Sequence, residues 1–183
     1  LHMDSMYATM CDPVTKKKHY QYCLIVTDGF TEFRYVAVSD AMSDIKREMI
    51  EIIKTSTTIS GRKPRLIVSD LGKEFDNGAT ARYCADNGIK LQPTPARAKE
   101  LNGVAEKSVD TVKNHVRTML LAARIPDRMG WKYALQHHVY LWNRTHIGKA
   151  TSKTPYEMMF KREPSIMHVG VFGSDAYVHM DRS

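Results

Sequence analysis

The chain has 183 residues, a formal net charge of +7 and a pI near 9.3. This length suits one compact domain, or one domain with an extension. The hydrophobic fraction of 43% and the charged fraction of 26% are typical of folded proteins and argue against general disorder. No apolar run approaches the roughly 20 residues that a membrane-spanning helix needs.

The three cysteines and the first residues predict the compartment. Cys11, Cys23 and Cys84 form no Cys-x-x-Cys pair, so we expect a reducing compartment and no disulfide framework. The opening Leu1–Asp4 lacks the basic region of a secretory signal. Because the first residue is not Met, we expect the chain to be a fragment of a longer protein.

The positive charge is concentrated in the second half of the sequence. Residues 1–96 have a net charge of +1, whereas residues 97–183 have a net charge of +6. Such an excess is usually found on solvated helix faces. Together with a chemical site nearby, however, it would indicate a polyanionic partner.

The first third of the chain predicts three strands followed by a helix. The expected strands, rich in aromatic and β-branched residues, are 1–10, 20–27 and 33–38, and their short connections predict an antiparallel meander. The period then changes, and Asp40 or Ser43 could cap a helix that runs to about Thr58.

The rest of the chain alternates short strands with helices. We expect strands at 66–68 and 89–92, a helix between them that runs through Tyr83 and is ended by Asn87-Gly88, and a mobile loop over 93–103. Two longer helices are expected at 104–123 and 127–144, followed by a short helix at 156–160 and a strand-like tail at 169–180. Thr154 and Pro155 have the pattern of an N-cap followed by Pro at the first helical position.

Two carboxylates stand where such elements begin or end. Asp70 follows a buried strand, and Glu106 is predicted in the first turn of the long helix, with 35 residues between them. Phosphoryl transfer by two metal ions requires carboxylates that converge on the ions, because hard cations prefer oxygen ligands. Separately, Asp70 could be a turn residue and Glu106 a charge that stabilises a helix N-terminus.

Three separated blocks resemble the catalytic core of retroviral-type integrases, and most closely those of copia-type LTR retrotransposons. The first block is Ser69–Phe75, and the second is Asn102–Lys107, at the family's 35-residue spacing. The third is downstream, where Tyr140–Arg144, Lys153–Glu157 and Val171–Gly173 occur in the family's order. The resemblance implies an α/β fold of the RNase H-like type, with a mixed five-stranded sheet flanked by helices. We assign residues 1–145 to this core and residues 146–183 to a C-terminal extension of helix and strand.

The family needs a third carboxylate on its first strand, and two residues compete for that role. Asp4 lies within the first predicted strand, where RNase H-like folds carry a metal-binding acid. Asp28 ends the second strand, in a segment that resembles a family motif whose acid is not the catalytic one. We favour Asp4, so that Asp4, Asp70 and Glu106 are the predicted catalytic and metal-binding residues.

The same resemblance indicates residues for DNA contact and some departures from the family pattern. Leu71 replaces an Asn that the family often carries, and Asp110 stands where retroviral relatives have a DNA-contacting Lys. Lys113 and Arg117 are four residues apart and fall on one helix face. The predicted DNA-binding residues are Arg97, Lys99, Asn102, Lys107, Lys113 and Arg117.

The resemblance implies an integrase that uses two Mg²⁺ or Mn²⁺ ions to trim retrotransposon DNA ends and join them to target DNA. The implied partners are DNA and further copies of the chain, with no membrane, and the implied location is the host nucleus after a cytoplasmic particle stage. An RNase H-like nuclease and a domesticated, non-catalytic DNA-binding or interaction domain remain alternatives. The pattern of a zinc-binding module is absent, so we expect no zinc. We interpret the Asn143-Arg144-Thr145 glycosylation sequon as a chance match.

Overall fold

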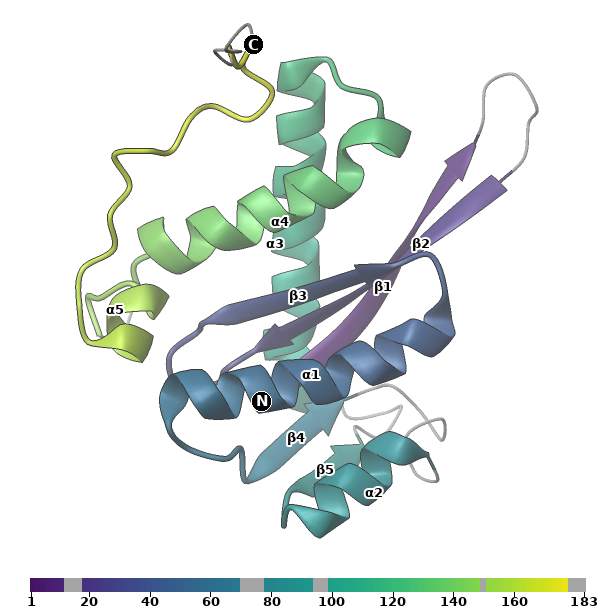
Figure 1. Cartoon of the computed structure of the whole chain (residues 1–183), viewed down its shortest axis with the longest axis vertical. Coiled ribbons are helices and arrows are strands. Elements are labelled where there is room, and N and C mark those ends of the chain that lie inside the picture. The colour runs from purple at the N-terminus through teal and green to yellow at the C-terminus, as the bar shows by residue number, and fades with distance from the viewer. Residues whose placement is uncertain (12–17, 70–77, 94–98, 149–150, 178–183) are drawn as a thin grey trace, which may run out of the picture.

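The structure is a computed structural model, and it describes residues 1–11, 18–69, 78–93, 99–148 and 151–177. In these residues one mixed sheet of five strands is covered by helices on both faces, as Figure 1 shows. The strands are β1 (His2–Cys11), β2 (Lys18–Thr27), β3 (Arg34–Ser39), β4 (Leu66–Ser69) and β5 (Lys90–Pro93). The helices are α1 (Met42–Ser60), α2 (Ala79–Asp86), α3 (Lys99–Ala123), α4 (Asp127–Thr145) and α5 (Pro155–Phe160).

The sheet has the order β3-β2-β1-β4-β5, with β1 in the middle. β1, β2 and β3 pair in antiparallel fashion, as the predicted meander requires, whereas β4 pairs in parallel with both β1 and β5. Parallel strands need crossover connections: α1 links β3 to β4, and α2 links β4 to its parallel neighbour β5. The predicted mixed five-stranded α/β fold is therefore confirmed.

Alternation along the strands divides the core into two layers. Met3, Leu24 and Val26 lie on the face that α1 covers, together with Ile45 and Met49 of that helix. The next residues along the same strands, including Met6, Cys23 and Ile25, lie on the other face with Val109, Val112 and Val116 of α3. In Figure 1, α1 accordingly crosses in front of the strands and α3 passes behind them.

Two helix starts differ from the predictions. α3 begins at Lys99, so residues 99–103 are helical, whereas the sequence predicted a loop to Gly103; residues 94–98 lie outside the described residues. α1 has Ala41 at its N-cap and no side-chain cap, so neither Asp40 nor Ser43 caps it. The Ser39 hydroxyl instead holds this turn, since it accepts from the Ala41 N–H and donates to Asp44.

The predicted cap of the last helix is confirmed. The Thr154 hydroxyl accepts a hydrogen bond from the Glu157 N–H, and the Glu157 carboxylate accepts one from the Thr154 N–H. Pro155 occupies the first helical turn, where its missing N–H costs nothing. This reciprocal capping box defines where α5 begins.

The predicted strand in the C-terminal tail is wrong for residues 169–177, and residues 178–180 lie outside the described residues. In its described residues the tail contacts helices and pairs with no sheet edge. Phe172 packs onto the α3 and α4 core, and its ring lies 5.6 Å from the ring of His137. Val171 is 83% exposed, so this residue of the tail does not belong to a buried strand face.

Replacing Gly173 by Ala is expected to release this tail. Gly173 has a φ of +82°, and an added Cβ would overlap the Cβ of Ala123. We expect a loss of about 2 kcal/mol, limited to the docking of the tail, because detachment relieves the overlap. Limited proteolysis should show faster cleavage within residues 161–177. Gly61→Ala, at a φ of +67° with open space around it, is the control for backbone strain alone. Equal protection of the tail in wild type and Gly173→Ala would contradict the anchor.

Candidate active site

Asp4 lies on the central strand, on the sheet face that α3 covers. It pairs across the strands with Ile25, which belongs to the α3 core, and cross-strand partners share a face. Only 8% of Asp4 is exposed. One residue before it, Met3 pairs with Ser69 at the end of β4. The first predicted carboxylate therefore stands beside the carboxyl end of the strand that leads to Asp70.

The thiol of Cys23 is buried close to the negative charge of Asp4. The pKa of Cys23 is raised above its usual value, first by burial and second by the negative charge of Asp4. The thiol therefore stays protonated, and Cys23 behaves as a small core residue with no nucleophilic role.

The side chains of the other two predicted carboxylates, Asp70 and Glu106, lie outside the part of the chain that the structure describes. Asp70 is the next residue after Ser69 in the chain and lies outside the described residues. Glu106 is the eighth residue of α3, so the prediction that it occupies the first turn is wrong; its side chain also lies outside the described part. Because the helix dipole acts mainly on the first turn, stabilisation of a helix end no longer explains an acid at this position.

Asp28, the competing first carboxylate, is engaged in a turn. Its Oδ1 atom accepts hydrogen bonds from the Thr31 N–H and the Thr31 hydroxyl, both at 2.8 Å, and from the Phe30 N–H at 3.2 Å. These donors close the connection between β2 and β3, which is the common structural use of Asp in a turn. The geometry thus gives Asp28 a role that needs no metal.

The structure describes the side chains of three of the six predicted DNA-binding residues. Lys107, Lys113 and Arg117 are exposed on α3, and Asp110 is exposed on the same helix. The buried Val112 and Val116 mark the inner face, so the cationic side chains point away from the core. Lys99 and Asn102 lie in α3 with side chains outside the described part, and Arg97 lies outside the described residues altogether.

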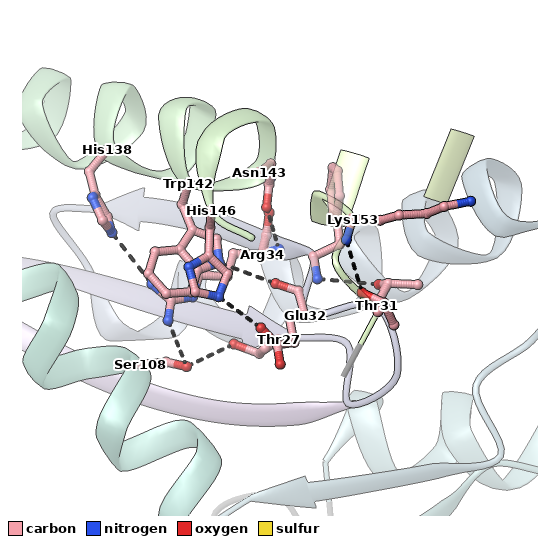
Figure 2. A network of polar contacts seen from close by, with 12 residues as sticks. Thr27, Thr31, Glu32, Arg34, Ser108, His138, Trp142, Asn143, His146 and Lys153 are labelled. Atoms are coloured by element: carbon pink, nitrogen blue, oxygen red, sulfur yellow. Dashed lines mark hydrogen bonds and ion pairs between the residues drawn. The ribbon is translucent and has the colours of Figure 1, made fainter. Parts of the chain in front are cut away.

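A buried polar network that the sequence did not predict lies beside these residues, and Figure 2 shows it in detail. At its centre is Arg34 of β3, only 4% exposed. Its guanidinium donates to the Ser108 hydroxyl of α3 at 3.3 Å and to His138 Nε2 of α4 at 3.4 Å. It also stacks over the Trp142 ring, 3.5 Å from the centroid. One cation therefore ties the β3 edge to both helices of this face.

The network also holds the backbone of Arg34. The Asn143 side chain accepts from the Arg34 N–H and donates to the Arg34 carbonyl, both at 2.8 Å. Both polar groups of the Asn143 amide are occupied inside the folded domain, where Asn143 is buried. The sequon at this residue is therefore inaccessible to glycosylation in the folded chain.

Burial weakens the charge of Arg34 without removing it. Desolvation lowers the pKa of the guanidinium to about 10, against the raising effect of the Glu32 charge. Arg34 therefore stays protonated at neutral pH. The sequence contained a signal for this residue, because Arg34 is a charged residue inside an apolar strand. Charged residues are almost never buried without partners.

His138 has one defined tautomer in this network. Arginine can only donate, so His138 Nε2 accepts from Arg34, and its proton is on Nδ1, which donates to His115 Nδ1 at 3.2 Å. Burial, followed by the charges of His115, Arg34 and His137, lowers the pKa of His138 to about 3. The ring is therefore neutral in the folded chain.

We expect His138 to make the fold sensitive to acid. Its folded pKa lies below the unfolded value of about 6.5, so the unfolded chain binds an extra proton below that pH. The free energy of unfolding should fall by about 2 kcal/mol from this group alone between pH 7 and pH 5. Urea unfolding at both pH values, on wild type and His138→Gln, measures the difference. An NMR titration that finds the His138 ring protonating near pH 6 would contradict it.

A hollow of about 290 Å³ lies between the end of β2 and the N-terminal half of α3. Asp28, Lys107 and Trp142 line it, together with the Arg34 side chain. Lys107 directly follows Glu106, so this hollow brings two cationic side chains close to that part of α3. Asp28 and Glu32 also line the hollow, so its two cationic side chains are offset by two acids.

In the described part of the chain, no group of three or more His, Cys, Asp or Glu side chains could hold a metal ion. Two of the three predicted ligands have side chains outside that part. The described helices include none with the length and apolarity needed to cross a bilayer.

The chain is similar in sequence to retrotransposon polyproteins. It is 26% identical over 185 residues to the retrovirus-related Pol polyprotein from transposon TNT 1-94 of Nicotiana tabacum, covering 98% of this chain and 14% of that protein. It is 27% identical over 165 residues to the corresponding polyprotein from transposon RE1 of Arabidopsis thaliana, covering 90% of this chain and 11% of that protein. The chain thus spans about a seventh or less of these relatives. No protein-family model matches it.

The fold is that of retroviral integrase cores. The catalytic core domain of HTLV-2 integrase in complex with magnesium, in its trimeric form, matches with a TM-score of 0.59 at 17% identity, over 86% of this chain and 95% of that one. The simian T-cell lymphotropic virus intasome in complex with a PP2A regulatory subunit matches with a TM-score of 0.63 at 11% identity, over 98% of this chain and 60% of that one. The chain therefore carries an integrase-like core, with an RNase H-like fold and with retrotransposon Pol polyproteins among its sequence relatives.

Proposed function

We propose that this chain is the catalytic core of a retrotransposon integrase, which trims the ends of element DNA and joins them to target DNA. The observation that carries the proposal is the register of β1 and β4. It places Asp4 one residue beyond the Met3–Ser69 pair, on the face covered by the helix that contains Glu106. The end of β4 that leads to Asp70 and the helix that contains Glu106 thus both lie beside the first strand.

The residues fit a hard divalent cation. Asp4 is a largely buried carboxylate on a rigid central strand, and Asp70 and Glu106 supply the same oxygen donors. Asp4, Asp70 and Glu106 would hold the ions, two Mg²⁺ or Mn²⁺ by the family resemblance. When bound, such ions lower the pKa of an attacking water or hydroxyl and stabilise the leaving oxygen.

The remaining residues would bind and orient DNA. Lys107, Lys113 and Arg117 present exposed cations along α3, where they can contact backbone phosphates of element ends or target DNA. Binding of this kind is strongly salt-dependent, because each phosphate contact releases counterions. Arg97, Lys99 and Asn102 precede Glu106 in the chain and complete the proposed DNA contacts.

Three further features are proposed by analogy. The retroviral cores of similar fold are described as trimeric and dimeric forms and the related complex as an intasome, which supports a homodimer or higher oligomer here. An integrase would act in the host nucleus after a cytoplasmic particle stage. The core would span residues 1–145, and residues 146–183 would form an extension that packs on α4 through α5 and Phe172.

A strand-transfer assay with labelled element-end DNA tests the function. Wild type is expected to join DNA only when Mg²⁺ or Mn²⁺ is present, and Glu106→Gln and Asp70→Asn are expected to lose joining while still binding DNA. If both variants join DNA as well as wild type, the catalytic assignment is wrong. Cleavage without joining would favour an RNase H-like nuclease. DNA binding without either reaction would favour a non-catalytic domain.

A further inference from the structure

A second cavity lies on the opposite face of the sheet from Asp4. Its volume is about 350 Å³, and residues from α1, the connection between β2 and β3, the connection between α1 and β4, and α5 line it. Tyr35, which lines it, belongs to the core layer under α1, whereas Asp4 faces α3. This cavity is therefore separate from Asp4, the proposed catalytic acid whose side chain the structure describes. Its size is in the range of cavities that hold one small ligand.

One wall of the cavity is cationic. Arg62 and Lys63 come from the connection between α1 and β4, and Lys161 comes from the C-cap of α5. All three residues are exposed at the rim. Asp28 is the acid on the lining, and its Oδ1 atom is already held by the three donors of the β2–β3 turn. The lining side chains therefore leave an excess of positive charge, which favours an anionic group.

A buried hydroxyl lies among the lining residues. Tyr35 is 8% exposed, and its hydroxyl makes no hydrogen bond within the described part of the chain. A buried polar group without a partner costs free energy, and such groups are rare in native structures. Burial, followed by the charge of Asp28, raises the pKa of Tyr35, so the phenol keeps its proton and remains a donor. An oxygen-rich anion would supply the missing acceptor.

The remaining wall is apolar and includes an exposed ring. Phe30 is 76% exposed although it is a large apolar residue, and it borders the cavity together with Met158 and Met159. An aromatic face beside a cationic wall suits a nucleobase attached to a phosphate, because bases stack on aromatic rings while Lys and Arg bind the phosphate. An acidic peptide would use the cations but would leave this aromatic surface without a partner.

We propose that this cavity binds a nucleoside phosphate, with the phosphate between Arg62, Lys63 and Lys161 and the base against Phe30. The ligand is either a free nucleotide or one nucleotide of a single strand. The site goes beyond the proposed integrase activity and does not depend on the catalytic carboxylates.

Titration calorimetry in EDTA tests the site without metal-dependent chemistry. For this experiment the protein is prepared with an acetylated N-terminus. The amino group of Leu1, which also borders the cavity, then adds no charge. The probes are deoxyadenosine 5′-monophosphate, deoxyadenosine and a short oligodeoxyadenylate. Tyr35→Phe is expected to weaken binding of the monophosphate about fivefold and Arg62→Gln about tenfold, in line with a neutral and a charge-assisted hydrogen bond. Lys132→Gln, which removes an exposed lysine of α4, is the matched control and should keep wild-type affinity.

The outcomes distinguish a free nucleotide from a nucleotide of a single strand, and they distinguish this site from the proposed integrase activity. Binding of the monophosphate but not of deoxyadenosine indicates a free nucleotide, and binding of only the oligonucleotide indicates a strand. Thermal unfolding of Tyr35→Phe checks that the variant is folded. Equal affinity of wild type, Tyr35→Phe and Arg62→Gln for every probe would overturn the site. Because the measurement contains no divalent metal, loss of DNA joining in Glu106→Gln leaves this result unaffected.

Discussion

Asp4→Asn is expected to abolish DNA joining, with a rate loss of about a thousandfold or more, because metal ligands contribute several kcal/mol to transition-state stabilisation. Asp28→Asn is expected to keep most of the activity. Its Oδ1 atom serves the Thr31 and Phe30 donors, and the carbonyl oxygen of an amide can accept the same hydrogen bonds. The pair of variants therefore decides which of the two acids is the first carboxylate.

Single-turnover strand transfer in Mg²⁺ and in Mn²⁺ measures this difference. Circular dichroism and DNA-binding affinity should match wild type for both variants, so that the loss is assigned to chemistry. If Asp28→Asn loses joining and Asp4→Asn keeps it, the first carboxylate is Asp28, and the metal site must be rebuilt around the β2–β3 turn.

Asn143→Ala is expected to lower the free energy of unfolding by about 3 kcal/mol. The substitution removes both hydrogen bonds to the backbone of Arg34 and leaves a buried N–H and a buried carbonyl without partners. Alanine is the better helix former, but that gain is below about 1 kcal/mol. The loss of side-chain hydrogen bonds should therefore dominate.

Asn114→Ala is the matched control, because Asn114 is exposed on α3 and the same substitution there changes only helix propensity. Urea unfolding followed by fluorescence of Trp142 and Trp131 gives both values. A loss of less than about 1 kcal/mol in Asn143→Ala would mean that water replaces the amide and that the site is less buried than the structure indicates.

Local patterns predicted most of the fold. Aromatic and β-branched residues located the strands from Tyr22 to Val38, and Thr154 with Pro155 predicted the start of α5. The start of α3 was missed because Asn102-Gly103 has the composition of a turn, although here both residues are helical. The tail was predicted to be a strand, but apolar residues such as Val171 are exposed and form no buried strand face.

Only the residues of the candidate site that lie in family motifs could be predicted from the sequence. The family resemblance selected Asp4, Asp70 and Glu106, and the structure adds the strand register around Asp4. The Arg34 network could not be predicted, because Ser108, His138 and Asn143 reach Arg34 from positions 74 to 109 residues away. Local periodicity contains no information on contacts at such separations.

The Asn143 amide has one further consequence, which concerns association between molecules. β3 is at the edge of the sheet, where free backbone groups invite another strand to add. At Arg34 the outward N–H and carbonyl are already bonded to an amide from α4, in the pattern that a neighbouring strand would provide. One side chain thus closes this end of the edge to β-strand addition, which protects the folded chain against edge-to-edge aggregation.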